Sequence, residues 1–587
     1  MTRRIPSPRR PRRPLPVGRG PAPVDLMLLD GTTSQALEAG RTRLIAVGLL
    51  FCLAFGIIGL RVMDLALLRD GNEPRLAAEA GRKTLVTDRA DIVDRNGIVL
   101  ATSLPTASLY ANPRQVRDPE ATAAALARVL SDVNPVVLAG KLRSDRSFVW
   151  LKRNLSPREH YEVNRLGVPG LDFKREEQRV YPHGALLTHV LGLVDVDNKG
   201  IAGLEKRFDA QLRGGTEPLA LSVDLRLQHI LSEELQGAMT AFEAIGAAGM
   251  ILDAESGEVL AMSSLPSFDP DQAGRASEEA RFNRAALGVY EMGSVFKIFT
   301  TALALESGTV TLADGFDASE PIRVARHTIR DFKPKNRWLS VPEIFVYSSN
   351  IGTVHMAMET GTEAQQGFLD ALGLTTPAAI ELPEVGAPML PSPWREINTM
   401  TISFGHGMAV SPVQLTSAVA SVVNGGELRP ATLLKRPEGA PKGGRRVLSK
   451  ATSEQMRWLM RQVVLQGTGG KAAAPGYLVG GKTGTADKLR DGRYARGSRI
   501  ASFVGAFPMH APRYVIFAMV DEPKGQKKSY GYATGGWVAA PAVGRVVARI
   551  GPLVGLKPLP VRTEEEEGED QDLMVQASAG GFAFAFE

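Results

Sequence analysis

Strand-like segments at two distant places constrain the fold of the second half of this chain. Residues 247–266 (AAGMILDAESGEVLAMSSLP) form two apolar runs around a polar turn, which predicts a hairpin. Three more strand-like runs follow much later: YLVGGKTGTADKL, RIASFVGAF and RYVIFAMVDE. Helical patterns, including 295–306 and 412–424, lie between the two groups. We therefore expect one antiparallel sheet that closes late in the sequence, with helices packed on it, in a domain over 221–555.

A different, mixed pattern precedes that domain and predicts a separate α/β module over residues 69–220. Asn-Gly within Asp94–Gly97 is a typical hairpin turn. Residues 120–142 read as helical with a break at Pro135, and 148–155 read as a strand. Because this module holds no catalytic constellation, we expect it to have a structural or partner-binding role.

An uncharged run of seventeen residues extends from Leu44 to Leu60 (LIAVGLLFCLAFGIIGL), and VMDLALL follows Arg61. About 20 apolar residues cross a bilayer. The sequence therefore predicts one uncleaved transmembrane signal anchor over 44–68, since the run is longer than a signal-peptide core. Residues 1–43 should be cytoplasmic because they are basic, and the chain from about residue 70 should be exported.

Charge is concentrated at the two ends of the chain. Residues 1–43 hold nine arginines against three acids, whereas 562–587 hold one arginine against eight acids. A nucleic-acid binder would carry its positive charge on a folded domain, so we expect no nucleic-acid partner. The acidic tail, 556–587, is predicted to be disordered. The only cysteine, Cys52, lies in the apolar run, which excludes an intramolecular disulfide.

Three short motifs occur in a fixed order and carry the chemistry: Ser294-Val-Phe-Lys297, Ser348-Ser-Asn350 and Lys482-Thr-Gly-Thr485. Each alone has an ordinary structural explanation: a capped helix with a solvent-facing lysine, a helix N-cap, and a lysine on an edge strand. Together they supply what acyl transfer needs, namely a nucleophile with a nearby amine base, a polar relay and a cationic strand.

The residue types fit these roles. Ser294 begins an apolar helix, and Lys297 follows on the same face. Lys297 can act as a base only if its pKa falls, and burial and a second cation such as Lys482 would lower it. Ser348 can pass a proton to a leaving amine, and Asn350 can align an amide.

The third motif is suited to anion binding. Lys482, Thr483 and Thr485 can gather a carboxylate, and Gly484 lets another backbone approach closely. The N–H groups of Thr485 and Ser294 are candidates for an oxyanion hole. The eight histidines lack metal-ligand spacing and no phosphate-binding loop is present, so we expect no metal and no cofactor.

With these motifs the chain resembles the class B penicillin-binding proteins. Other stretches are similar to landmarks of that family: RADIVDRNGIVLA, RVYPHG, GIAGLEKRF, SVDLRLQ and VGGKTGTADK. EMGSVFK, SFGHGMAVSPVQL and GYATGGWVAAPAVGRVV resemble its division-specific FtsI type. Ala90 and Met292 stand where a glycine and a proline are usual.

The resemblance implies a fold, a reaction and partners. The fold would be an α/β (α+β) multidomain chain with a membrane anchor, a pedestal (dimerisation) domain over 69–220 and a transpeptidase domain over 221–555. Ser294 would be acylated by a peptidoglycan pentapeptide stem, releasing D-Ala, and a neighbouring stem's amine would take the acyl group. β-Lactams would block Ser294. The location would be the inner membrane, with a periplasmic catalytic domain and the glycosyltransferase FtsW and other division proteins as partners.

Other interpretations remain open at this stage. The same enzyme could serve side-wall elongation instead of division, and depletion would then give round cells rather than filaments. A β-lactam sensor would usually carry a cytoplasmic effector or several membrane spans. A catalytically silent scaffold would be expected to have a broken motif, and all three motifs are intact.

Overall fold

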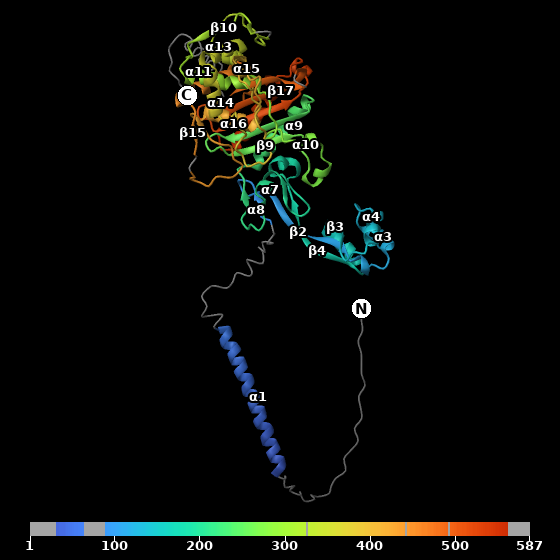
Figure 1. The fold of residues 1–587 in the computed structure, drawn as a ribbon. Helices are drawn as coiled ribbons and strands as arrows, with labels where there is room; N and C mark the ends of the chain where they lie inside the picture. The colour runs from blue at the N-terminus through green and yellow to red at the C-terminus, as the bar shows by residue number, and fades with distance from the viewer. Residues whose placement is uncertain (1–30, 64–88, 325–326, 441–442, 491–492, 561–587) are drawn as a thin grey trace, which may run out of the picture. The chain divides into compact units, whose positions relative to one another are not determined.

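The computed structural model describes residues 31–63, 89–324, 327–440, 443–490 and 493–560. These residues belong to two units, one within Met1–Leu85 and one within Val86–Glu587 (Figure 1). Most of the basic tail and of the acidic tail lies outside the described ranges.

The first unit contributes one helix, α1 (Gly31–Met63). Within the part of the chain that the structure describes, no helix is both long enough and apolar enough to span a membrane. The predicted span over 44–68 is therefore not supported by the described helix, and residues 64–68 lie outside the description.

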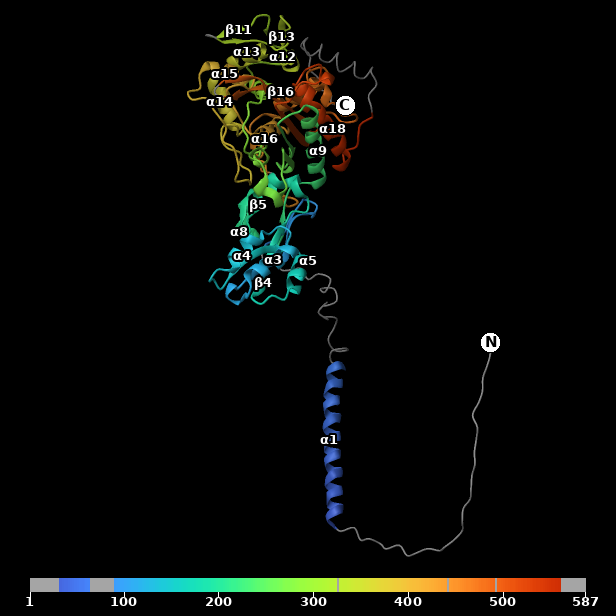
Figure 2. The same ribbon diagram turned by 90° about the vertical axis from the view of Figure 1, so that its right-hand side faces the viewer.

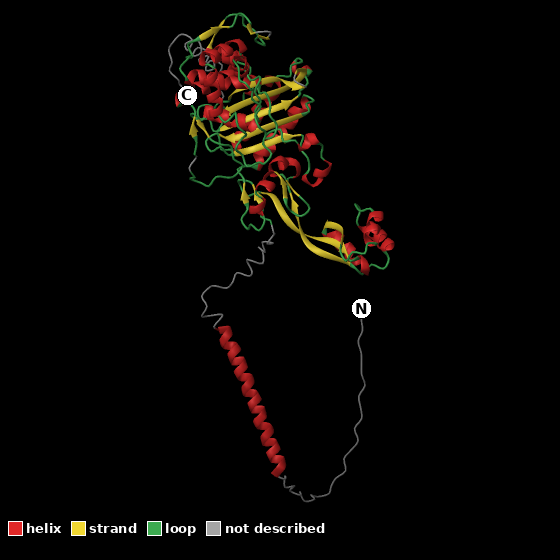
Figure 3. Cartoon of the chain, viewed as in Figure 1, coloured by secondary structure: helices red, strands yellow, loops and turns green. Residues whose placement is uncertain are grey.

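The second unit begins with an α/β module that contains a five-stranded sheet (Figure 3). Its strands are β1 (Ile92–Val93), β2 (Val99–Ala111), β3 (Val149–Leu155), β4 (Leu171–Val180) and β7 (Leu219–Ala220). β1 and β2 pair antiparallel around the predicted Asn-Gly turn, and β2 pairs with β4 over ten residue pairs. Three helices share a core with β2 and β3: α3 (Pro119–Val129), α4 (Pro135–Leu142) and α5 (Pro157–Arg165). The predicted helix over 120–142 is thus two helices, and the second starts at Pro135 as expected.

A buried ion cluster joins three segments of this module. Arg89 and Glu205 have no exposed side-chain surface, and the Arg89 Nε donates to Glu205 at 2.7 Å. Arg179 on β4 donates to the other Glu205 oxygen at 2.7 Å, and Asp209 accepts from Arg89 at 2.6 Å. Glu205 belongs to α7 (Gly203–Arg207). Glu205 therefore pairs with two buried guanidinium groups, and Asp209 supplies the second negative charge through Arg89, as buried charges require.

The larger part of the unit is organised around a second five-stranded sheet, which confirms the expected late closure. Its order is β16-β17-β18-β8-β9, and every neighbouring pair is antiparallel. The strands are β8 (Gly246–Asp253), β9 (Val259–Leu265), β16 (Gly480–Arg490), β17 (Arg493–Phe507) and β18 (Tyr514–Asp521). β8 and β18 are neighbours in the sheet although they come from opposite ends of the domain's sequence. They pair from Gly246–Asp521 to Asp253–Tyr514.

Helices cover both faces of this sheet, so its strands are apolar on both faces rather than alternating (Figure 2). Met250 and Leu252 belong to one core, whereas Ala247 and Ile251 belong to the other, as the two-residue period of a strand requires. The second core is closed by α9 (Leu225–Ala241) and α18 (Gly535–Leu553).

The helices of the first core carry most of the predicted motifs. They are α11 (Lys297–Glu306), α12 (Val341–Tyr347), α13 (Asn350–Thr360), α14 (Thr362–Ala371), α15 (Glu396–Ser403), α16 (Pro412–Val423) and α17 (Lys450–Leu465). The helices predicted over 295–306 and 412–424 correspond to α11 and α16. Both begin or end within two residues of the predicted bounds.

Candidate active site

Ser294 lies in η5 (Gly293–Phe296), a 3₁₀ turn that leads directly into α11. Gly293 has a φ of +55°, and a Cβ at this position would lie 2.5 Å from the Thr485 carbonyl oxygen. Only glycine combines this backbone conformation with so close an approach. The turn that carries the serine is therefore pressed against the strand that carries the third motif.

Lys297 is fully buried, and its amine reaches the second motif. Its Nζ donates to the Ser348 carbonyl oxygen at 2.5 Å, to the Asn350 Oδ1 at 2.7 Å and to the Ser348 Oγ at 3.2 Å. Within the described ranges, no hydrogen bond joins Lys297 to the Ser294 hydroxyl. Catalytic hydrogen bonds often tighten only when substrate is bound, so the missing contact is compatible with a base role for Lys297.

Ser348 occupies the sharp turn between α12 and α13, with a left-handed φ of +61°. A non-glycine residue costs about 1–2 kcal/mol in this region. The turn brings the Ser348 hydroxyl between two amines, because the Lys482 Nζ donates to it at 2.9 Å and the Lys297 Nζ at 3.2 Å. The three motifs thus meet at one hydroxyl.

The third motif lies on β16, which is an edge strand of the sheet. Lys482 is fully buried, whereas Thr485 is partly exposed. The hydroxyl of Thr483 pairs with that of Thr468 at 2.7 Å. The Thr485 Oγ1 accepts from the Gly535 N–H at 3.1 Å, so its own proton remains available to a ligand.

Gly484 lets three segments meet beside the serine. A Cβ on Gly484 would lie 2.4 Å from the Met292 carbonyl oxygen, in the turn before Ser294. A Cβ on Gly535 would lie 2.5 Å from the Gly484 carbonyl oxygen. The close approach predicted for Gly484 is thus confirmed, and it fixes the distance between the nucleophile turn and β16.

Burial lowers the pKa of both motif lysines, and repulsion by Lys482 adds to the effect at Lys297. Burial and the positive charge of Lys482 hold the pKa of Lys297 well below its usual range. Burial alone lowers the pKa of Lys482 to about 7. Burial also lowers the pKa of His406, which therefore adds no positive charge at neutral pH. A neutral amine beside a serine is what general-base activation requires.

Asp331 supports the second motif and was missed in the sequence. Its carboxylate accepts the N–H groups of Asn350 at 2.5 Å and Ile351 at 3.0 Å, and the Ser349 hydroxyl at 2.7 Å. The Asn350 side chain also donates to the Arg330 carbonyl at 2.8 Å. The signal available was a carboxylate in a polar loop, which is too common to single out without the fold.

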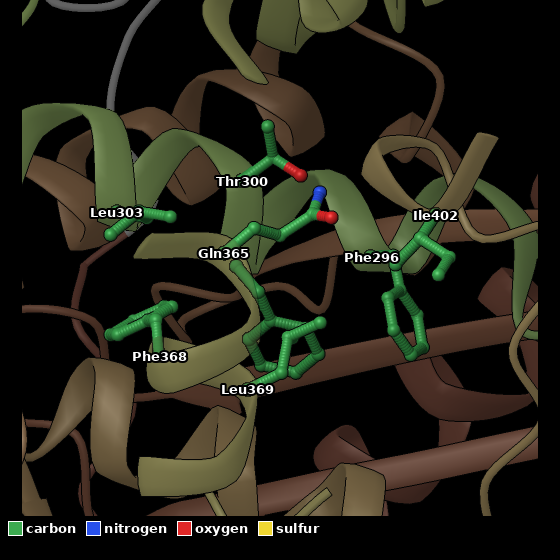
Figure 4. A pocket seen from close by; sticks show the side chains of 8 residues that line it. Phe296, Thr300, Leu303, Gln365, Phe368, Leu369 and Ile402 are labelled. Carbon is green, nitrogen blue, oxygen red and sulfur yellow. The ribbon is translucent and has the colours of Figure 1, made fainter. Parts of the chain in front are cut away.

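A small, mostly apolar pocket lies among α11, α14 and α15 (Figure 4). It is lined by Phe296, Phe299, Thr300, Leu303, Gln365, Phe368, Leu369 and Ile402. Its only polar groups are those of Thr300 and Gln365, and neither Ser294 nor either motif lysine lines it. The pocket is therefore part of the packing behind the nucleophile helix and not the place where a charged peptide binds.

A serine, a buried amine of lowered pKa, a shared hydroxyl and a cationic edge strand define a serine acyltransferase site. Residues 247–547 match the family model for the penicillin binding protein transpeptidase domain, and 84–233 match the penicillin-binding protein dimerisation domain.

Relatives cover most of the chain. It is 43% identical to the probable peptidoglycan D,D-transpeptidase FtsI of Caulobacter vibrioides, over 80% of this chain and 82% of that one. It is 29% identical to the peptidoglycan D,D-transpeptidase FtsI of Escherichia coli, over 84% and 88%. The structure of penicillin binding protein 3 from Mycobacterium tuberculosis, complexed with aztreonam, has a TM-score of 0.64 at 24% identity, covering 81% and 99%. The chain belongs to the class B penicillin-binding proteins of the FtsI type.

Proposed function

We propose that this protein is a peptidoglycan D,D-transpeptidase that cross-links stem peptides at the division septum through an acyl-enzyme on Ser294. The observation that carries the proposal is the Ser348 hydroxyl held between the Lys297 and Lys482 amines, beside a serine that is not hydrogen-bonded to either. The activity named for the FtsI relatives supports it.

In the first step, Ser294 Oγ attacks the carbonyl carbon of the penultimate D-Ala while Lys297 takes its proton. The N–H groups of Ser294 and Thr485 are the proposed donors to the oxyanion, and one such donor is worth about 10²–10³ in rate. The C–N bond then breaks. Ser348 passes a proton from Lys297 to the leaving amine, so D-Ala departs neutral at nitrogen and Lys297 is neutral again.

Substrate recognition is assigned to the third motif and to Asn350. Lys482 and the free proton of the Thr485 hydroxyl would bind the terminal carboxylate. Thr483 shares its hydroxyl with Thr468 and so would contribute mainly by holding the strand, with Gly484 setting its approach. Asn350 would align the peptide amide.

In the second step, the amine of a neighbouring stem attacks the acyl carbon, loses a proton to Lys297, and Ser294 regains its hydroxyl proton. β-Lactams would enter the first step and leave Ser294 acylated. The solved relative with aztreonam supports this point by its fold.

The site of action is proposed from the FtsI relatives. Depletion in the native organism should produce filaments. Round cells would indicate the elongation enzyme instead. We also propose FtsW and other division proteins as partners.

Membrane anchoring is a separate part of the proposal. The uncharged run, its continuation through residues 64–68 and the basic residues before it support an inner-membrane anchor with a periplasmic catalytic domain. The full chain should resist alkaline carbonate extraction from membranes, whereas a chain starting at residue 70 should be released. Release of the full chain by carbonate would contradict the proposed membrane anchor.

The test of the chemistry is labelling with a fluorescent penicillin. The parent should label covalently, and Ser294→Ala should not. Lys482→Ala should label more slowly because the β-lactam carboxylate loses its cation. A folded parent that does not label would overturn the proposed reaction.

A further inference from the structure

Glu291 is a carboxylate beside the nucleophile that the proposed reaction does not use. It precedes Ser294 by three residues, in the turn that is pressed against β16. Its Oε1 accepts the Gly407 N–H at 2.8 Å. The Tyr494 hydroxyl donates toward its two oxygens at 3.2 and 3.3 Å. These contacts hold the carboxylate in one orientation at the partly exposed rim of the site.

This carboxylate has no countercharge in the structure. Among the described residues, no lysine, arginine or histidine forms an ion pair with Glu291. Burial raises its pKa, as expected for a carboxylate that is withdrawn from water without a cation. The nearest titratable neighbour ring, His406, lies beside the Tyr494 ring at 5.8 Å and is neutral at pH 7, because burial lowers its pKa. A bound cation would therefore stabilise the charged form of the Glu291 carboxylate, which burial disfavours.

The other charged side chains of the site already have hydrogen-bond or ion-pair partners. Lys297 and Lys482 both donate to Ser348. Asp487, on β16 between the third motif and the hairpin end, is paired with Arg499 at 2.9 Å. Glu291 is thus the one carboxylate, among the described residues of this rim, that lacks a charged partner.

Its position along β16 suits one end of a stem peptide. The terminal carboxylate is proposed to bind at Lys482. Thr485, three residues further along β16, lies against Gly293, which follows Glu291 by two residues. An extended peptide advances about 3.3 Å per residue, so the third residue from the terminal carboxylate lies about 7 Å along the strand. The amine-bearing residue of a stem peptide is that residue in the donor, and its side chain extends the reach toward Glu291.

We infer that Glu291, oriented by Tyr494, binds the side-chain ammonium of the diamino acid of a stem peptide. The ammonium belongs either to the donor stem, lying along β16, or to the acceptor stem, whose bound ammonium first gives one proton to water so that the neutral amine can attack the acyl-enzyme. The inference rests on the proposed transpeptidase function and assigns the amine specificity of that same site.

The experiment has two arms that distinguish the sources. In the donor arm, D-Ala release is measured for a pentapeptide with a free side-chain amine and for the same peptide acetylated on that amine. In the acceptor arm, an N-benzoyl-D-alanyl thioester, which carries no ammonium, acylates the enzyme, and transfer to a diamino-acid peptide is compared with transfer to D-alanine. Fluorescent penicillin counts the competent active sites in each preparation.

Glu291→Gln keeps the shape and the Gly407 hydrogen bond but removes the charge. We expect it to lower the preference for the free amine, expressed as the ratio of kcat/KM values, by about tenfold in one arm, and the affected arm identifies the stem. Tyr494→Phe should lower the same ratio by a smaller factor. Glu278→Gln, on the exposed face of α10 (Glu278–Arg281), is the matched control.

An unchanged ratio in both arms for an enzyme that labels and turns over would overturn the assignment while leaving the transpeptidase in place. The inference would also be overturned by a parent that labels with penicillin but shows no preference in either arm, neither for the free over the acetylated amine in the donor arm nor for the diamino-acid peptide over D-alanine in the acceptor arm. A parent that neither labels nor turns over would remove the proposed function and this inference with it.

Discussion

Two lysine side chains with no exposed surface lie within hydrogen-bond distance of the Ser348 hydroxyl. Two adjacent ammonium groups out of water repel one another, so at least one must be neutral for part of the time. In the proposed reaction, Lys297 is the neutral base and Lys482 is the cation, so two residues of the same type take different charge states. Their titrations are those of a pair rather than of two independent groups.

The pH dependence of acylation should be bell-shaped. The rate should rise with pH as Lys297 loses its proton, and the pKa of Lys297 lies well below its usual range. It should fall again above about pH 7, because Lys482, with a pKa of about 7, loses the charge that binds the carboxylate. The measurement is kcat/KM for acylation by a carboxylate-bearing β-lactam from pH 5 to 10.

Lys482→Arg is the matched variant for the descending limb, since a guanidinium stays charged throughout that range. The limb should move to higher pH even if the maximal rate falls. If the descending limb of the variant lies at the same pH as that of the parent, Lys482 does not cause it.

Burying Lys482 should also make the protein less stable. Its pKa is about 7 in the folded protein and 10.5 when exposed, so between these values the unfolded chain binds more protons. Lys482→Met should therefore raise the free energy of unfolding by about 1–2 kcal/mol at pH 7. The gain should shrink as pH rises toward 10.5. Thermal melts at pH 7 and pH 10 measure it, and an equal or lower melting temperature at pH 7 would contradict it.

At the residue scale, the three motifs could be recognised in the sequence because each is contiguous and chemically distinctive. Hydrogen bonds join Lys297, Ser348, Asn350 and Lys482 in the structure, whereas the catalytic roles of these residues and of Ser294 stay predictions. Asp331 and Glu291 could not be predicted, because a single carboxylate in a loop has no local signature. Only the fold shows that Asp331 caps a helix and that Glu291 has no countercharge among the described residues.

At the scale of elements, α13 is capped twice: by its own Ser349, whose hydroxyl oxygen accepts the Gly352 N–H at 3.1 Å, and by Asp331 from outside the helix. Asp331 accepts two N–H groups of the first turn and one side-chain hydroxyl, and a negative charge is favourable there because of the helix dipole. The same contacts hold the left-handed turn at Ser348 in place. Helix stability and active-site geometry are therefore coupled at this point.

Asp331→Ala should lower stability by about 1–2 kcal/mol, as for loss of an N-cap, and should also slow acylation because Ser348 and Asn350 lose their support. Asp331→Asn keeps an acceptor oxygen and should restore part of the acylation rate. The two measurements are the urea midpoint and the penicillin labelling rate. Loss of stability with an unchanged labelling rate would show that the cap is purely structural.

At the scale of the whole molecule, the two α/β regions were predicted with different success. The catalytic sheet was predicted because its strands are strongly apolar and the helical patterns between them are long. In the pedestal, the hairpin and the break at Pro135 were predicted from turn chemistry. Its buried Arg89–Glu205–Arg179 cluster was not, because charged residues predict a surface unless the partners are known.

Removal of the shared carboxylate should destabilise the pedestal strongly. Glu205→Gln leaves Arg89 and Arg179 buried without their common countercharge, which typically costs about 3–5 kcal/mol. The urea midpoint of a chain that starts at residue 70 should fall accordingly. Glu217→Gln, an exposed glutamate in the same module, is the control and should leave the midpoint within error. Equal midpoints for the two variants would mean that the cluster adds nothing to stability.

The strand order of the catalytic sheet determines when during synthesis the enzyme becomes reactive. β8 and the serine helix leave the ribosome first, whereas β16 to β18 are made near the end of the chain. Until they arrive, β8 keeps an open edge, which is a template for pairing with other chains, and such long-range pairing forms slowly. A chain that stops before β16 therefore has its serine but lacks both Lys482 and the Thr485 N–H, so it should react with penicillin more slowly than the full chain and is prone to aggregate.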